Sequence, residues 1–128
     1  MLSTLNKSAV KCFLKLSKEL IKKKKRYIVP RDYDLNGRVI SYKQAFIELG
    51  IINKDDIWNY ILDLCEEDCF DVSNDRDTKY DMNSEMFEFI KEINGKNVYI
   101  KLTLRTSDNN DILVCLSFHE SVSNGRRG

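Results

Sequence analysis

The sequence predicts an α+β fold in which N-terminal helices pack on a C-terminal, mainly antiparallel β-sheet. Two observations support this prediction. The first half of the chain repeats apolar residues at helical spacing, whereas the segment 86–120 alternates apolar and polar residues as strands do. Helices that come first, followed by strands that succeed one another directly, are typical of an α+β domain.

Three helices are expected, over about 6–24, 41–49 and 53–65. Each begins at a side chain that commonly caps a helix N-terminus: Asn6 or Ser8, Ser41 and Asn53. Gly50 is expected to end the second helix. Between the helices we expect a short strand over 27–29, ended by Pro30, and a polar loop over 32–38. Residues 66–81 are acidic and lack periodicity, which predicts an irregular connection.

The strongest local signal is the dipeptide Asn94-Gly95 between two β-rich runs, because this pair favours a two-residue hairpin turn. Such a turn pairs Glu88 with Lys101 and sorts the side chains onto two faces. The apolar face holds Phe87, Phe89, Val98, Ile100, Leu102 and Leu104. The polar face holds Glu88, Tyr99, Lys101, Thr103 and Arg105. A third strand is expected over 112–118, ending beside His119.

Length and composition indicate one domain over 1–128, with a helical part about 6–65, a sheet part about 85–119 and a frayed tail 121–128. A hydrophobic content of 42% and a charged content of 32% fit a globular protein. The net charge of +1 shows no overall basic excess, so any RNA affinity requires local patches. No membrane span or signal peptide is recognisable, which predicts a cytoplasmic protein.

The four cysteines are interpreted as free thiols of a reducing compartment. The alternative is a zinc site that includes Cys65 and Cys69. Because the chain has a single histidine, such a site requires all four cysteines or added carboxylates. We expect no metal and no other cofactor.

The polar sheet face has the residue types that cleave a phosphodiester. Attack by a 2′-OH needs a base, a cation for the phosphate and an acid for the leaving 5′-oxygen. His119 is the natural acid, because the ordinary histidine pKa is about 6.5. Glu88 is either the base or the partner of Lys101 in an ordinary cross-strand ion pair. His119 could equally be a surface residue without a role.

Several runs of the chain, taken in order, resemble one family. They are YIVPRDYDLN, FIELGI, CEEDCFDVSNDRD, INGKNVYIKLTL and LSFHE, and they cover roughly residues 10–120. The chain resembles the MqsR-like toxins of bacterial toxin–antitoxin systems, which have a RelE-type fold. The resemblance implies a ribosome-independent endoribonuclease that cleaves single-stranded mRNA, slows growth and is neutralised by a cognate antitoxin protein.

The resemblance also suggests roles for individual residues. Tyr99 and Lys101 fall on the family's Tyr-x-Lys strand, which implies that Lys101 holds the scissile phosphate while Tyr99 orients it or stacks a base. The best-known member has Trp-Gln at Phe87-Glu88 and a lysine at both Asp71 and His119. These departures support a second hypothesis, a catalytically silent protein-binding module of a mobile element or phage.

Further cations are candidates for RNA binding: Arg105, Arg31, Arg76, Lys24 and Lys25. The arginines could hold a phosphate through two parallel hydrogen bonds. Two alternatives stay open. The lysines are also typical of a helix C-terminus, where the helix dipole favours positive charge, and Arg76, which lies between two aspartates, could form a salt bridge within its loop. The acidic span 55–81 repels RNA, and it either attracts a basic antitoxin segment or keeps the protein soluble.

Overall fold

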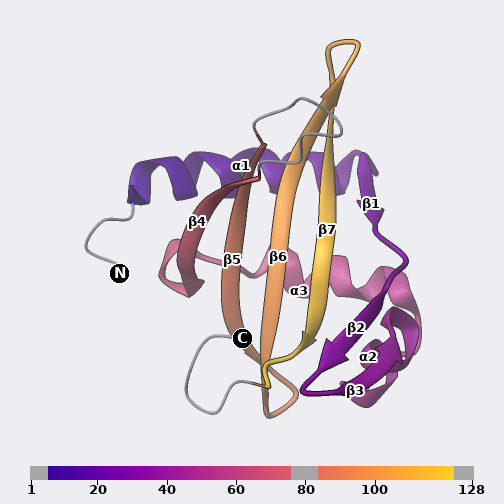
Figure 1. The fold of residues 1–128 in the computed structure, drawn as a ribbon. Coiled ribbons are helices and arrows are strands. Elements are labelled where there is room, and N and C mark those ends of the chain that lie inside the picture. Colours follow the sequence, from indigo (N-terminus) through magenta and orange to yellow (C-terminus); the bar gives the residue numbers. More distant parts are fainter. Residues whose placement is uncertain (1–5, 76–83, 123–128) are drawn as a thin grey trace.

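The computed structural model describes residues 6–75 and 84–122 and has the predicted α+β fold (Figure 1). Its helices are α1 (Lys7–Lys22), α2 (Tyr42–Glu48) and α3 (Ile57–Leu62), with short 3-10 turns η2 (Lys54–Asp56) and η3 (Glu66–Asp68). Its strands are β1 (Arg26–Ile28), β2 (Asp32–Leu35), β3 (Arg38–Ser41), β4 (Cys69–Asp75), β5 (Ser84–Ile93), β6 (Lys96–Ser107) and β7 (Asn110–Glu120).

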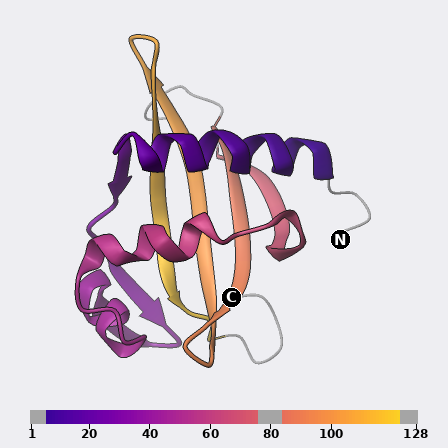
Figure 2. The same ribbon diagram turned by 180° about the vertical axis from the view of Figure 1, so that it is seen from behind.

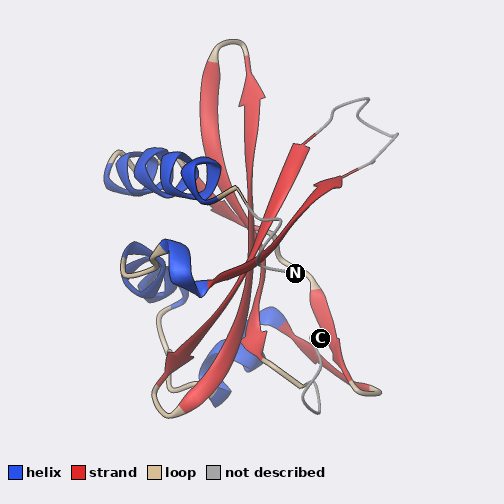
Figure 3. Ribbon diagram, turned by 90° about the vertical axis from the view of Figure 1, so that its left-hand side faces the viewer, coloured by secondary structure: helices blue, strands red, loops and turns tan. Residues whose placement is uncertain are grey.

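Five strands form one sheet in the order β1-β7-β6-β5-β4, and only β1 and β7 pair in parallel. The sheet is therefore mainly antiparallel, as predicted. Helices α1 and α3 lie against one of its faces (Figure 3), and α1 crosses in front of the strands when the molecule is seen from behind (Figure 2). The hairpin β2–β3 stands apart beside the end of β7 (Figure 1).

The main hydrophobic core fills the space between these helices and the sheet. In α1, the apolar stripe at helical spacing is buried, and Phe13 stacks on Phe87 of β5 with ring centroids 3.8 Å apart. All the residues predicted for the apolar sheet face lie on this side: Phe87, Phe89, Val98, Ile100 and Leu102 are at most 4% exposed, and Leu104 packs against the cluster. The opposite face carries Glu88, Tyr99 and Lys101, and apolar residues such as Ile90 and Val114 share it.

The predicted hairpin turn is confirmed. Ile93 pairs with Lys96 and Glu88 pairs with Lys101, so the register is the one inferred from the sequence. Asn94 and Gly95 have φ values of +53° and +83°, as a type I′ turn requires. The Asn94 side-chain amide donates a hydrogen bond of 2.7 Å to the Leu49 carbonyl, which ties the turn to the end of α2.

Substituting Gly95→Ala is expected to lower the free energy of unfolding by about 1–2 kcal/mol, because a Cβ is disfavoured in the left-handed conformation. Nothing lies within 4 Å of the added Cβ, so the loss should come from the backbone alone. Urea denaturation measures it. An unchanged midpoint would contradict the turn geometry.

The prediction of a polar loop over 32–38 is wrong, because these residues belong to the β-hairpin of β2 and β3. Tyr33 and Leu35 are buried while Asp32 and Asp34 are exposed. Buried and exposed side chains therefore alternate along β2, and the aspartates occupy the exposed positions. The turn Asn36-Gly37 has φ values of +59° and +88°. This is the same turn signal that was recognised at 94–95.

The helix and sheet limits also differ from the predicted ones. The first helix is capped by Asn6 and ends at Lys22, and the third ends at Leu62. Within the expected connection 66–81, residues 69–75 form β4, so the sheet extends well beyond 85–119. The remainder of that connection, from residue 76, lies outside the described residues. No helix within the described ranges is long and apolar enough to cross a membrane.

Candidate catalytic site on the open sheet face

A bulge in β7 decides where His119 points. Leu113 and Cys115 face the core, and strict alternation would send residue 119 to the same side. The register shifts between the pairs Lys101–Ser117 and Leu102–Cys115, which inserts Leu116 as an extra residue. Phe118 therefore enters the core, and His119 reaches the open face opposite Tyr99.

Five side chains form a continuous row across this face. The Tyr99 hydroxyl donates a hydrogen bond of 2.6 Å to Glu88 Oε1. The Tyr99 ring lies 5.3 Å from the His119 ring, and the His119 ring lies 4.8 Å from that of Tyr33. The guanidinium carbon of Arg31 lies 5.9 Å from the Tyr33 centroid. The row thus carries a carboxylate at one end and a guanidinium at the other.

The structure fixes the protonation preference of His119. Its Nδ1 lies 2.9 Å from the Glu120 carbonyl oxygen, and because a carbonyl can only accept, Nδ1 carries the proton. The Nε2 atom then presents a lone pair. Burial lowers the pKa of His119 below its ordinary value, and the positive charge of Arg31 adds to this effect. The neutral imidazole is therefore favoured near pH 7.

Both tyrosines of the row stay protonated. Burial raises the pKa of Tyr99, and its hydrogen bond to Glu88 raises it further. Burial also raises the pKa of Tyr33, which is only 3% exposed. Among the described residues, the Tyr33 hydroxyl has no hydrogen-bond partner of good geometry.

Sequence reasoning missed Tyr33 and Phe70. Tyr33 belongs to the hairpin read as a loop, although its alternation with aspartates was a usable signal. Phe70 lies at a register shift in β4 between Cys69 and Asp71, and its ring centroid lies 6.1 Å from that of Tyr99. Bulges re-aim side chains and are not visible in sequence periodicity.

Four of the predicted site residues meet here: Glu88, Tyr99, His119 and Arg31. Lys101 is the neighbour of Glu88 in the ladder and is half-buried. Within the described ranges no ion pair joins these two side chains, and Glu88 instead accepts from Tyr99. The alternative of a simple cross-strand ion pair is therefore wrong for this arrangement.

The other candidate cations lie elsewhere. Arg105 shares the strand with Tyr99 but pairs with Ile112, six residues and roughly 20 Å further along. Lys24 and Lys25 are exposed in the turn after α1, where the Leu113 amide donates to the Lys25 carbonyl. They belong to the opposite end of β7 from His119. Arg76 lies outside the described residues.

All four cysteines are free thiols, and their surroundings differ. Cys12 and Cys65 are exposed, whereas Cys69 and Cys115 are buried. Burial raises the pKa of Cys69 to about 11 and that of Cys115 to about 12, which keeps both thiols protonated. No group of three histidine, cysteine or acidic side chains with metal-binding geometry occurs in the part of the chain that the structure describes.

No known family model, curated protein or solved structure matches this chain. The geometry of the site combines a carboxylate, a neutral imidazole with a free lone pair, two protonated phenols and two cations on one sheet face. Such a set can exchange protons with a bound anion.

Proposed function

We propose that this protein is an MqsR-like toxin with a RelE-type fold that cleaves single-stranded mRNA in the cytoplasm without a metal ion. The observation that carries the proposal is the row Arg31–Tyr33–His119–Tyr99–Glu88, which places a proton acceptor between a guanidinium and a carboxylate. Four of its five members were candidates on sequence grounds alone. A cognate antitoxin protein is the expected partner.

The chemistry needs only the groups on this face. His119 Nε2 takes the proton of the 2′-OH, the 2′-oxygen bonds to phosphorus, and the bond from phosphorus to the 5′-oxygen breaks. Lys101 gives a proton to the leaving 5′-oxygen, which yields a 2′,3′-cyclic phosphate and a 5′-OH. Arg31 and Lys101 balance the charge that develops on the phosphate.

In this mechanism His119 is the general base, whereas the sequence predicted it to be the general acid. A neutral imidazole is a base and not an acid, and burial lowers the pKa of His119 and so favours the neutral form, although the hydrogen bond to the Glu120 carbonyl acts in the opposite direction. Glu88, expected as the base, accepts the hydrogen bond of the Tyr99 hydroxyl and so fixes the phenol ring beside His119. Glu88 and Tyr99 are therefore positioning residues in this proposal.

One observation favours the second hypothesis of a silent binding module. Asp71 pairs with Glu88 in the sheet, and it is exposed. Two neighbouring carboxylates at the edge of the site repel an RNA phosphate. On this reading the protein acts by docking on a partner, and its expression affects growth without shortening mRNA.

Expression of the wild type is expected to arrest growth and shorten bulk mRNA. Lys101→Ala and Tyr99→Phe should relieve both effects, because the first removes a charge from the phosphate and the second removes the hydrogen bond to Glu88. Growth curves and northern blots measure the result. Lys7→Ala is the matched control, since it removes an exposed lysine of α1, on the helical side of the sheet, and should leave toxicity unchanged. Full toxicity of both folded site variants would refute the assignment.

A further inference from the structure

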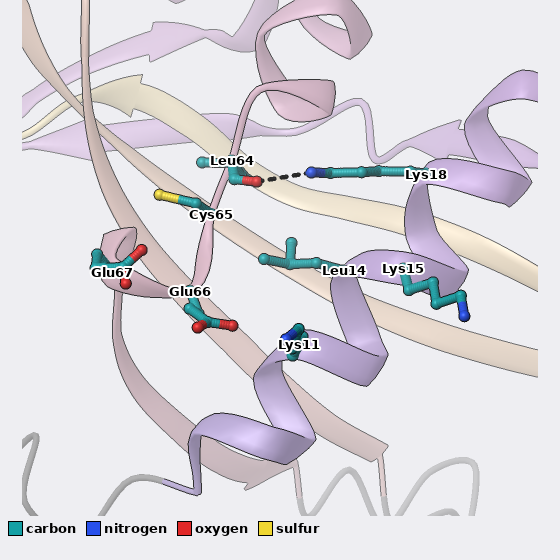
Figure 4. A pocket seen from close by; sticks show the side chains of 8 residues that line it. All are labelled: Lys11, Leu14, Lys15, Lys18, Leu64, Cys65, Glu66 and Glu67. Carbon is teal, nitrogen blue, oxygen red and sulfur yellow. Dashed lines mark hydrogen bonds between the residues drawn. The ribbon is translucent and has the colours of Figure 1, made fainter.

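The helical face of the molecule has a groove that the proposed catalytic site does not use. It lies between α1 and the segment that follows α3 (Figure 4), on the helical face of the sheet, whereas His119 lies on the open face. Its volume is about 470 Å³. It is lined by Lys11, Leu14, Lys15, Lys18, Leu64, Cys65, Glu66 and Glu67.

The groove has an apolar floor and two walls of opposite charge. Leu14 lies at its base and points from α1 toward the facing segment (Figure 4), whereas Leu64 is fully buried beneath the base. The lysine wall spans Lys11 to Lys18, about 10 Å along the helix. Lys18 is fixed by a hydrogen bond of 2.9 Å from its Nζ to the Leu64 carbonyl oxygen. This bond holds the two walls together.

The other two lysines of the wall are not paired with an acidic side chain of the described residues. Lys11 and Lys15 form no ion pair within the described ranges, although Glu66 and Glu67 stand on the facing wall. They also belong to a strongly basic region. Residues 7–26 contain nine lysines or arginines and one glutamate, a net charge of +8, so the rest of the chain carries −7 against a total of +1.

A basic surface of this kind attracts either nucleic acid or an acidic protein segment, and the groove distinguishes them. A phosphate backbone gains nothing from a leucine floor, and Glu66 and Glu67 repel it. A peptide can place an apolar side chain on the floor, carboxylates toward Lys11 and Lys15, and a basic side chain toward the glutamates. The charge pattern therefore matches a peptide.

We infer that this groove is a docking site for a segment of a partner protein that presents an apolar side chain next to carboxylates. The lysine wall is two helical turns long, which suits a short helix or three to four extended residues. The inference does not depend on catalysis, because none of the lining residues belongs to the row on the sheet face.

The test uses the immobilised full-length protein and a phage-displayed library of random 12-residue peptides. Selected peptides are expected to combine leucine or phenylalanine with acidic residues. Their affinity should fall at least about tenfold for the double variant Lys11→Glu/Lys15→Glu. The matched control, Lys23→Glu/Lys25→Glu, makes the same charge change outside the groove and should retain binding.

Thiol blocking gives an independent readout, because Cys65 lines the groove and Cys12 is exposed on α1 outside it. In the Cys12→Ser variant, alkylation of Cys65 by N-ethylmaleimide should prevent the selected peptides from binding. In the Cys65→Ser variant, alkylation of Cys12 by the same reagent should leave peptide binding unchanged. Failure to select any peptide, or selected peptides that bind all variants equally, would overturn the inference.

A fluorescein-labelled 12-nucleotide oligouridylate tests the nucleic-acid alternative. The two double charge variants have the same net charge, so the oligonucleotide is expected to bind both equally. A loss of affinity confined to Lys11→Glu/Lys15→Glu would assign the groove to nucleic acid and overturn the peptide assignment.

Discussion

Replacing His119 with glutamine is expected to slow RNA cleavage by about 10²–10⁴-fold, the usual contribution of a positioned acid or base. Glutamine keeps polarity and approximate size but cannot accept a proton at neutral pH. The purified protein is assayed on single-stranded RNA, and the product ends are analysed. Wild-type products should carry a 2′,3′-cyclic phosphate or a 3′-phosphate, and cleavage should persist in EDTA. Equal rates for the two proteins would remove His119 from the mechanism.

The pH profile separates the two roles of His119. If it is the base, kcat/KM rises with pH through its pKa, which lies below the ordinary 6.5. If it is the acid, the rate falls over the same range. Stability offers a check that does not require activity. Because the folded pKa is lowered, the wild type should lose stability as pH falls from about 6.5 through the folded pKa, and His119→Gln should lose less.

Features set by neighbouring residues were predictable from the sequence. Asn94-Gly95 fixed the register of β5 and β6, because a two-residue turn determines every pair that follows it. The same signal at Asn36-Gly37 was passed over, since aspartates are unusual in strands and the segment was short. The acidic strand β4 was missed for the same reason.

The site itself depends on contacts that no local pattern shows. Tyr33 and His119 are 86 positions apart, and they meet because a hairpin outside the main sheet stands beside β7. The direction of His119 depends on the bulge at Leu116, which reverses the alternation of the strand. The lowered pKa follows from burial, so the exchange of acid for base could not be anticipated from residue type.

Replacing Phe118 with alanine is expected to cost about 3–5 kcal/mol of the free energy of unfolding, the range for a large buried aromatic. Phe118 is 0% exposed and meets Phe46 of α2 edge to face, with centroids 5.6 Å apart and planes at 83°. The cavity would lie directly behind His119. A loss of this size is a large part of the roughly 5–15 kcal/mol that stabilises a typical domain.

Urea denaturation with Ile112→Ala as the matched control tests this prediction. Ile112 lies on the same strand but is 36% exposed, so its truncation should change stability by only about 0.5 kcal/mol. Phe118→Leu should lie between the two, because it keeps most of the apolar volume while losing the ring contact with Phe46. If Phe118→Ala cost no more than Ile112→Ala, α2 would not be packed on β7. The bulge would then lack the buried anchor that turns His119 onto the open face.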